Sequence, residues 1–526
     1  MQRSIRLGHC ICDAAQPCPC DLFKEKDICM CAGERMDVPD SPIALTRLVE
    51  KAGCASKIDQ AFLKAALKGL PALDDPRVLV GMPAGDDAGV YEIGGGTALV
   101  QTVDVFTPSV DDPYQFGQVA AANSLSDIYA MGGRPITALS IVGFPVRKVA
   151  DGVFHKIMRG GIDKMTEAGV PVIGGHSIDD NQIKAGFAVT GLIRKEQVAT
   201  NANARVGDVL ILTKPLGTGI VAFAAQIGRA LNGSADAAVR SMTTLNKTAA
   251  ELMNAHKVHA CTDVTGFGLT GHLCEMALRS GVDAELNWDS LPWFPGVMQY
   301  AADGILPGGI ERNKESCLDR VFAGEGISEP MLDMCFDPQT SGGLLMSVDP
   351  ADAPRLLGAL HNAGVADACI IGKVKGPGEG RIYIETTGKR RLPMSTEQTR
   401  TEQFASPADC CAEPAPEKSC CSPAASVSNC CASGSEPGEE PQAEEIYGQF
   451  LAAVGKPGCL DAFTKQAINI ALAVATRCEP CLKAHLQKAR QNGFTAAEID
   501  EAAWMGVGFG GSPALMMYSR LKNAKS

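Results

Sequence analysis

Short apolar runs alternate with amphipathic stretches over most of this chain. Four runs are partly β-branched and bounded by Gly, Pro or Asp, a pattern typical of buried strands: Thr97–Val103, Ile136–Val142, Val209–Thr213 and Gly343–Val348. Between them, residues 116–131, 153–168 and 268–280 space their apolar side chains with a helical period. This alternation predicts an α/β or α+β architecture rather than a helical bundle or a β-sandwich.

The pattern changes toward both ends. Residues 393–445 are mainly Ala, Pro, Ser, Glu and Cys, which bury too little apolar surface to offset the entropy of ordering. Beyond them three helices are predicted over 463–477, 481–492 and 496–505, with Gly493 ending the second and Thr495 capping the third. We therefore predict a Cys-rich module at 1–40, two α/β domains at 43–205 and 206–392, a disordered linker at 393–445, and a small all-α domain at 446–526.

Length and charge narrow the class of protein. At about 150 residues per domain, 526 residues predict three or four domains. A net charge of −12 leaves no broad basic field for nucleic acid. The first twelve residues lack the apolar core of a secretory signal, and no run reaches the roughly 18 apolar residues of a membrane helix. The sequence predicts a cytoplasmic protein with neither a nucleic-acid nor a membrane partner.

The 21 cysteines are distributed unevenly: six lie within 10–31, six within 410–431 and three after residue 458. Because thiols stay reduced in the cytoplasm, such clusters indicate metal, iron–sulfur or redox chemistry more often than structural disulfides.

Aspartates with Gly, Ser or Thr neighbours are the most informative feature of the central region. Four motifs contain them: Gly85-Asp86-Asp87-Ala88, Thr102-Val-Asp104, Asn123-Ser-Leu-Ser-Asp127 and Thr262-Asp263. Any one of these could simply cap a helix or close a turn. Several carboxylates converging from strand ends would instead hold Mg²⁺, which pairs one or two carboxylates with nucleotide phosphates.

Two further motifs suit a phosphate site. Gly174-Gly175-His176-Ser177 follows the apolar run 170–173 and predicts a strand that enters a tight loop, where backbone N–H groups can approach phosphate or adenine. Lys57 could neutralise a transferring phosphoryl group, and its ammonium would favour the thiolate of Cys54. Taken alone, a surface lysine beside a packing cysteine explains this pair equally well.

Together these motifs closely resemble the selenophosphate synthetase (selenide, water dikinase) family, in order from Thr46 to Gly343. Five segments, two of which contain motif residues already named, also carry the resemblance: Gly53–Lys57, Ala121–Pro135, Leu212–Gly217, Pro307–Asn313 and Asp337–Gly343. The resemblance implies an α/β (α+β) two-domain fold of the aminoimidazole ribonucleotide synthetase type and a homodimer joined through its amino-terminal sheets. It also implies the reaction of ATP, selenide and water to give selenophosphate, orthophosphate and AMP.

The resemblance assigns site residues one by one. Cys54 and Lys57 take the catalytic positions, and Asp87, Asp127 and Asp263 take the Mg²⁺ positions. The positions that contact ATP or its metal-bound phosphates are Lys57, Ala84, Gly85, Asp86, Asp104, Asp127, Gly175, His176 and Ser177.

The catalytic loop departs from the family pattern in one respect. Many members have Cys-Gly-Cys-Lys where this chain has Cys54-Ala-Ser56-Lys57, so a second thiol has no role here and the loop is less pliable. Hydrogen selenide is already an anion at neutral pH, so the protein needs no strong general base. Its task is to hold the nucleophile in line and to neutralise phosphate charge.

The carboxy-terminal region has its own motif, Cys478-Glu-Pro-Cys481-Leu-Lys-Ala-His485. A thiol pair near a helix start with a histidine on the same face suits disulfide exchange; zinc is the alternative, with Cys459 as a fourth ligand. The segment 460–504 resembles the carboxymuconolactone decarboxylase and alkylhydroperoxidase D-like family, which is all-helical and oligomeric. Its redox members commonly have a proton-relaying Glu where this chain has Gln466, which disfavours peroxidase activity.

The two cysteine-rich extensions leave several interpretations open. Six thiols between Cys10 and Cys31, in a segment with little core, indicate bound zinc or an iron–sulfur cluster, with redox or selenium handling as an alternative. The three Cys-Cys pairs between Cys410 and Cys431 could chelate soft metals or metalloids, or belong to a plain tether.

Three functions remain in competition at this point. The first is an ATP-dependent selenide kinase whose thiol modules, or a thiol-redox or selenium-delivery partner, supply reduced selenium to Cys54. The second is a related kinase acting on another small substrate. The third is a selenium or metal carrier built on an inactive scaffold, which the retention of Lys57 and the carboxylates disfavours.

Overall fold

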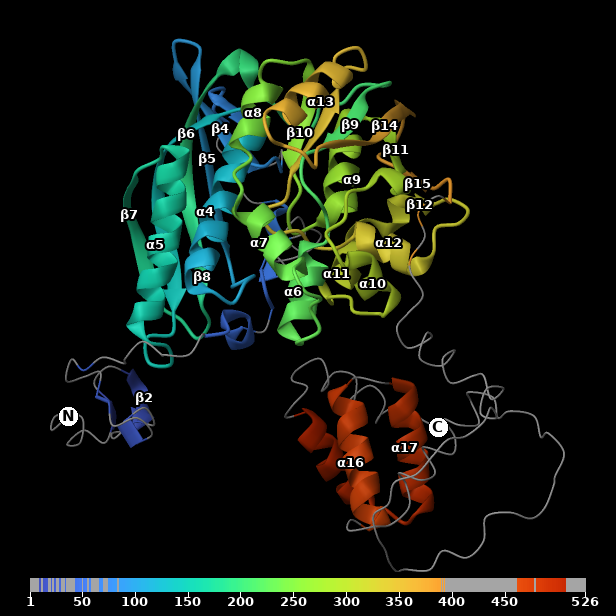
Figure 1. Cartoon of the computed structure of the whole chain (residues 1–526). Helices are drawn as coiled ribbons and strands as arrows, with labels where there is room; N and C mark the ends of the chain where they lie inside the picture. The colour runs from blue at the N-terminus through green and yellow to red at the C-terminus, as the bar shows by residue number, and fades with distance from the viewer. Residues whose placement is uncertain are drawn as a thin grey trace, which may run out of the picture. The chain divides into compact units, whose positions relative to one another are not determined.

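The computed structural model places the chain in two compact units, residues 1–412 and 413–526 (Figure 1). The structure describes residues 9–10, 13–17, 20, 23–24, 28–29, 34, 43–49, 51–53, 56–57, 66–69, 74–82, 85–388, 390, 392, 461–476 and 479–507. Cys54, Ala84, Cys478, and the Cys-Cys pairs lie outside this set, as do Cys12, Cys18 and Cys31. Near the amino terminus, β1 (His9–Cys10) pairs with β2 (Asp13–Pro17).

The amino-terminal half of the first unit is built on a six-stranded sheet in the order β3-β4-β5-β8-β6-β7. Its strands are β3 (Val78–Val80), β4 (Gly89–Gly94), β5 (Thr97–Phe106), β6 (Arg134–Phe144), β7 (Val172–Asp179) and β8 (Lys184–Arg194). Helices α4 (Pro113–Ala130) and α5 (Asp151–Ala168) lie side by side over one face of the sheet (Figure 1).

Two glycines let α4 and α5 approach closely. A Cβ on Gly117 of α4 would lie 1.9 Å from the carbonyl oxygen of Ile157, and one on Gly160 of α5 would lie 1.9 Å from that of Tyr114. Helix α4 begins where Asp112 caps it through the N–H of Gln115, with Pro113 in the first turn. Most of α4 is buried, because the sheet covers one side and α5 another. A buried helix of this kind can position polar side chains rigidly.

The carboxy-terminal half holds a seven-stranded sheet in the order β10-β13-β9-β14-β11-β15-β12. Its strands are β9 (Val209–Leu212), β10 (Val258–Asp263), β11 (Val282–Asn287), β12 (Val321–Ala323), β13 (Leu344–Val348), β14 (Cys369–Pro377) and β15 (Ile382–Glu385). Its helices are α6 (Thr218–Gln226), α7 (Ser234–Thr243), α8 (Lys247–Met253), α9 (Gly268–Ser280), α10 (Val297–Ala302), α11 (Gly309–Cys317), α12 (Glu329–Cys335) and α13 (Ala353–Asn362). One continuous apolar core joins this half to the amino-terminal half.

The second unit is helical in its described part. Helix α16 (Ala462–Ala475) packs against α17 (Glu479–Gln491), and a third helix begins at residue 496 and is described to residue 507. Gly493 has a φ of 85°, and the Thr495 hydroxyl and main-chain N–H both donate to the carboxylate of Glu498. These contacts form a capping box, and they confirm the helix end at Gly493 and the cap at Thr495 that the sequence predicted.

The predicted fold class and the predicted strands and long helices are confirmed, with one correction. Gly174–Ser177 do not form a loop after a strand, since they lie inside β7. The strand continues because Gly175 pairs with Ser140 of β6, where a Cβ on Gly175 would lie 2.1 Å from the Ser140 hydroxyl. The glycine therefore permits close strand pairing instead of a turn.

Candidate active site

The ammonium group of Lys57 is fixed against the carboxylate of Asp104 on β5. Its Nζ lies 2.7 Å from Oδ1 and 2.8 Å from Oδ2 of Asp104, whose side chain is only 10% exposed. The side-chain amide of Asn123 on α4 donates to the same carboxylate, and the hydroxyl of Ser124 donates to the Asp104 carbonyl at 3.1 Å. The site thus holds a lysine charge in one place through a charge-assisted pair.

Asp127 lies one helical turn beyond Asn123 on α4, and so faces the same direction. The hydroxyl of Thr102 on β5 donates to Asp127 Oδ2 at 2.5 Å. Burial raises the pKa of Asp127, and the nearby charges of Asp263 and Asp104 raise it further. Asp127 therefore comes from helix α4, within the stretch 116–131 for which the sequence predicted a helix.

Asp87 and Asp263 complete an acidic cluster, by which we mean Asp87, Asp104, Asp127 and Asp263. The hydroxyl of Thr262 on β10 donates to Asp87 Oδ1 at 2.8 Å. Burial and the charge of Asp263 raise the pKa of Asp87 well above its ordinary value, and burial raises the pKa of Asp263 to about 6. The Oδ2 atoms of Asp87 and Asp263 are buried and have no hydrogen-bond partner in the described structure.

These unpaired oxygens fit the chemistry of Mg²⁺, which takes oxygen ligands and keeps several waters. Within the described residues, no three His, Cys, Asp or Glu side chains converge closely enough to enclose an ion by themselves. When bound, Mg²⁺ would take further ligands from nucleotide phosphates and water. Asp87, Asp127 and Asp263 are the residues that would hold it.

A loop from the carboxy-terminal half, Asp337–Gly343, reaches into the cluster; we call it the Ser341 loop. Ser341 has a φ of 49°, and its N–H donates to Asn123 Oδ1 at 2.8 Å. The buried ammonium of Lys214 donates to the Ser341 carbonyl at 3.0 Å and to the Thr244 carbonyl at 2.7 Å. Burial lowers the pKa of Lys214 to about 7. The Ser341 loop is therefore held through both the N–H and the carbonyl of Ser341.

Sequence reasoning gave no individual role to Thr102, Asn123, Lys214, Thr262 or Ser341. All five stand inside the motifs that carry the family resemblance, and that position was the available signal. Their contacts join segments far apart in the chain, which motif spacing does not reveal.

The residues expected to contact ATP fall into two groups. Gly85, with a φ of 55°, and Asp86 lie next to Asp87, and the Asp86 carboxylate accepts the N–H of Asn201 at 3.3 Å. Burial raises the pKa of Asp86. Gly175, His176 and Ser177 are exposed on β7, an edge strand that β6 and β8 separate from Asp104 on β5. Within one chain the structure does not bring this second group to the acidic cluster.

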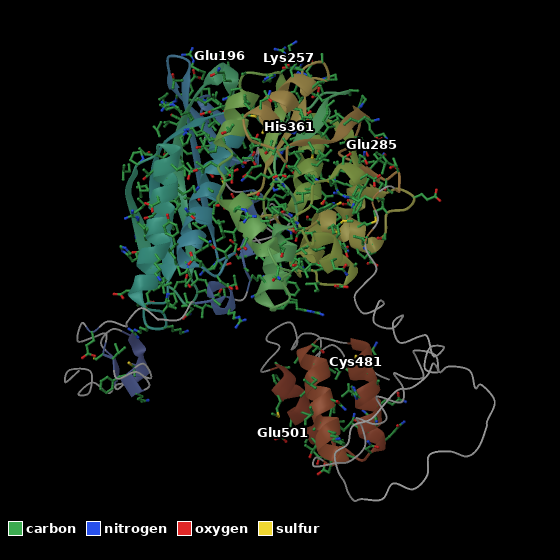
Figure 2. The ribbon with its side chains drawn as sticks, in the orientation of Figure 1. Glu196, Lys257, Glu285, His361, Cys481 and Glu501 are labelled. Atoms are coloured by element: carbon green, nitrogen blue, oxygen red, sulfur yellow. The ribbon has the colours of Figure 1, made fainter. Side chains whose placement is uncertain are left out.

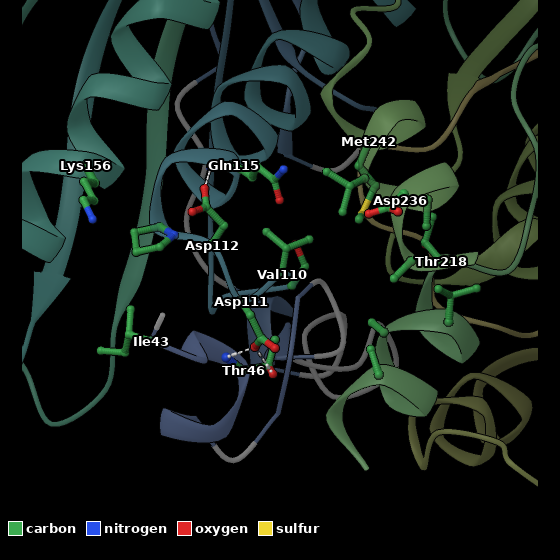
Figure 3. Close-up of a pocket in the computed structure, with 18 of the residues that line it drawn as sticks. Ile43, Thr46, Val110, Asp111, Asp112, Gln115, Lys156, Thr218, Asp236 and Met242 are labelled. Atoms are coloured by element: carbon green, nitrogen blue, oxygen red, sulfur yellow. Dashed lines mark hydrogen bonds between the residues drawn. The ribbon is translucent and has the colours of Figure 1, made fainter. Parts of the chain in front are cut away.

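A cavity of about 530 Å³ lies near the start of α4, between that helix and α6 and α7 (Figure 3). Asp112, Gln115, Asp236 and Met242 are among its lining residues. None of the predicted metal or ATP residues belongs to the described part of its wall. This cavity is therefore not the predicted phosphate site.

Comparison with known proteins assigns the first unit. Residues 85–193 match the family of AIR synthase related protein, N-terminal domain, and residues 205–385 match the corresponding C-terminal domain family. A selenide, water dikinase of Pelobacter propionicus is 46% identical over 346 residues, which is 66% of this chain and 99% of that protein. One of Geobacter metallireducens is 47% identical over 343 residues, 65% of this chain and 99% of that protein.

The chain belongs to the selenide, water dikinase family.

Solved structures of other proteins align less closely with this selenide, water dikinase family member. A thiamine-monophosphate kinase from Stenotrophomonas maltophilia K279a has a TM-score of 0.42 at 19% identity, covering 59% of this chain and 92% of that chain. The hydrogenase maturation protein HypE has a TM-score of 0.41 at 18% identity, covering 64% of this chain and 97% of that chain.

The two relatives named above match 66% and 65% of this chain, and residues 441–521 match the carboxymuconolactone decarboxylase family. Cys481 lies on α17 in the helical unit (Figure 2), where it is exposed and disulfide-bonded. His485 follows one turn later, and Gln466 of α16 donates to its carbonyl at 2.8 Å, with the amide nitrogen 3.5 Å from Nδ1. Burial, with the charge of Lys488, lowers the pKa of His485.

Among the described helices, none is both long and apolar enough to cross a membrane. Of the amino-terminal cysteines whose side chains are described, Cys20 and Cys29 are free thiols.

Proposed function

We propose that this chain catalyses the reaction of ATP, selenide and water to give selenophosphate, orthophosphate and AMP. The observation that carries the proposal is Lys57, held against Asp104 beside three more buried carboxylates at the junction of the two halves. Membership of the selenide, water dikinase family supports the substrate. The carboxylates would hold Mg²⁺, which when bound supplies charge neutralisation and orientation for the phosphates.

The chain's own residues have separate tasks in this proposal. Lys57 stabilises negative charge on the transferring phosphoryl group, since Asp104 and Asn123 fix its position. Gly85 and Asp86 contact the nucleotide, together with Ala84. Cys54 receives or orients selenium, three residues before Lys57 in the chain. A soft anionic nucleophile such as hydrogen selenide needs positioning and not deprotonation.

We assign the second group of ATP-contacting residues to a partner subunit. β7 is an edge strand whose residues 173–179 are all exposed, and Ile173 and Ile178 are 65% and 53% exposed. Leu139 on the adjacent strand β6 and Val103 on β5 of the same sheet are also exposed. An unpaired strand edge beside exposed apolar side chains favours association of two amino-terminal sheets. Gly175, His176 and Ser177 would then reach the site of the other copy.

The reaction is tested by ³¹P NMR of the purified chain with ATP, Mg²⁺ and anaerobic selenide. We expect selenophosphate and AMP in equal amounts. Folded protein that consumes ATP without forming selenophosphate, or forms neither product, would contradict the proposal. Lys57→Met should lose the activity, while Lys373→Met, on the exposed part of β14, should keep it.

The shared site is tested by mixing two inactive variants, Lys57→Met and His176→Trp, the second at an exposed position of β7. If His176 acts across the dimer, a mixed dimer contains one intact site and one with both defects, so mixing restores activity. A mixture that stays inactive after verified subunit exchange would show that both residues serve the same chain.

We assign thiol chemistry to the two regions outside the α/β domains, residues 1–40 and 446–526. Cys478, Cys481 and His485 form a redox site that acts on, or delivers, reduced selenium and takes no direct part in the phosphoryl transfer. Cys478→Ser or Cys481→Ser should therefore leave turnover with supplied selenide nearly intact, whereas Cys54→Ser should abolish it. We also propose that Cys10–Cys31 bind zinc or an iron–sulfur cluster, which metal analysis of the purified chain would test. Limited proteolysis would test the predicted segment boundaries at residues 40, 205, 392 and 445.

A further inference from the structure

A second cavity, of about 230 Å³, lies beside Gly53; we call it the Gly53 cavity. Its wall is formed by residues 51–53, by one side of α6 from Gly219 to Gln226, by the beginning of α11 and by the Ser341 loop. The described lining residues that matter here are Lys51, Gly53, Ser109, Gly308, Arg312 and Thr340. None of these residues belongs to the predicted metal or ATP site.

The Gly53 cavity is electropositive. Lys51 and Arg312 contribute two cationic side chains, and no Asp or Glu is among the described residues of the wall. Helix α11 presents its first turn through Gly308 and Gly309, and no side chain caps this turn. A helix start with uncapped N–H groups attracts anions. The cavity therefore contrasts with the acidic cluster, where like charges repel.

One buried hydroxyl in the wall has no partner. Ser109 is 3% exposed, and its Oγ makes no hydrogen bond within the described structure. A buried hydroxyl without a partner is costly, so its persistence in a cavity wall points to a ligand that can bond to it. Ser109 also lines the 530 Å³ cavity described above, and its Cβ faces Gly53.

Because Gly53 has no side chain, Ser109 and Thr340 can pack close to its backbone in the cavity wall. Its φ is 62°, and a Cβ there would lie 2.7 Å from the Thr340 hydroxyl and 3.0 Å from Ser109 Cβ. Its N–H is directed to the carbonyls of Thr107 and Pro108, each at 3.1 Å. Any other residue at this position would push Ser109 and Thr340 apart.

Two short chain segments connect the wall of the Gly53 cavity to residues that contact the acidic cluster. Gly53 stands four residues before Lys57, which pairs with Asp104. Thr340 of the cavity wall is followed by Ser341, whose N–H bonds to Asn123 beside the same carboxylate. An anion in the cavity would therefore sit close to the phosphoryl-transfer site without sharing its carboxylates.

We propose that the Gly53 cavity binds a small tetrahedral oxyanion of the orthophosphate class, held by Arg312, the Ser109 hydroxyl and the first turn of α11. The identity of the natural ligand rests on the proposed function, whose reaction releases two such anions, orthophosphate and selenophosphate. Binding itself does not depend on turnover. The cavity offers the departing oxyanion a positively charged binding site outside the acidic cluster, whose carboxylates repel anions.

The test measures binding of inorganic phosphate to the full-length chain by ³¹P line broadening, with EDTA present and nucleotide absent. EDTA excludes phosphate binding through a metal ion at the acidic cluster. We expect saturable binding that Arg312→Gln weakens about tenfold, since a charge-assisted contact is lost. Gly308→Asp should weaken it similarly. Gly308 has a φ of −60° and open space around a Cβ, so this variant adds a carboxylate to the cavity without strain.

Arg355→Gln is the matched control. It removes an exposed arginine from α13, with a side chain 78% exposed, and should bind phosphate like the unaltered chain. If Arg312→Gln does not fold, Gly308→Asp decides alone. Equal affinity in every variant, or no saturable binding by the unaltered chain, would overturn the proposal. Saturable binding that these variants weaken supports it even in a protein that forms no selenophosphate, so the two failures are distinguishable.

Discussion

The main-chain N–H of Ser341 donates a hydrogen bond of 2.8 Å to the side-chain oxygen of Asn123. The nitrogen of the same amide donates to Asp104, which holds the ammonium of Lys57. One buried side chain thus connects a loop of the carboxy-terminal half to the lysine that the proposed mechanism uses. The position of Lys57 depends on both halves of the first unit.

Asn123→Ala should slow AMP formation by a factor on the order of 10 to 100, because Asp104 and the Ser341 N–H each lose a buried partner. The rate is measured with saturating ATP and selenide. Asn254→Ala is the control: its amide also links the two halves, to the Gly132 carbonyl at 3.0 Å, but lies outside the site. A rate for Asn123→Ala equal to that of the control would contradict the coupling.

Asp263→Asn should stabilise the metal-free chain by about 2 kcal/mol near pH 7. The pKa of Asp263 is raised to about 6, so the charged form costs stability above that pH, and a neutral amide removes the cost. Urea unfolding in EDTA measures the change. Added Mg²⁺ should stabilise the unaltered chain and not this variant, and activity should be lost.

Asp208→Asn is the control for Asp263→Asn, because it should change stability in the opposite direction. The Asp208 carboxylate accepts hydrogen bonds from Ser347 at 2.7 Å and from the Arg205 N–H at 2.9 Å, so this substitution should lower stability. A loss of stability in both variants would show that Asp263 is not an uncompensated charge.

Lys214→Met should change how stability depends on pH. The pKa of Lys214 is lowered to about 7 in the folded chain, so between about pH 7 and its unfolded value only the unfolded chain holds the proton. The unaltered chain should therefore gain stability relative to the variant by about 1.4 kcal/mol per pH unit as the pH rises through that range. Denaturant unfolding at about pH 7.5 and about pH 9.5 measures the difference.

Lys214→Gln separates the charge from the hydrogen bond in the same experiment. It retains an N–H donor toward the Ser341 carbonyl but has no charge, so it should share the pH profile of Lys214→Met while keeping more activity. Parallel stability profiles for all three proteins would mean that Lys214 does not titrate in this range.

Gln466→Glu should raise the pKa of His485 by about one unit, because a carboxylate beside the imidazole favours its charged form. NMR titration of the histidine ring measures the shift. Gln491→Glu adds the same charge at the exposed end of α17 and should shift the pKa by a few tenths at most. Equal shifts in the two variants would contradict the contact between Gln466 and His485.

The sequence by itself determined the local elements and the chemistry available to them. Apolar periodicity predicted β5, β6, β9 and β13 and the helices between them, because side-chain period follows directly from backbone geometry. Thr495 and Gly493 predicted a helix start and a helix end, since capping involves neighbours within a few residues. The aspartate motifs carried the family resemblance before any contact was known.

The tertiary structure decided which of these residues meet. Asn123 and Ser341 are 218 positions apart, and Lys214 and Ser341 are 127 apart. Their meeting follows from strand order and from the packing of α4, which no local period encodes. The same strand order places Gly175 at an edge, away from Asp104. The sequence specifies which side chains are available. A site of buried charges forms only where long-range contacts bring those side chains together and exclude water.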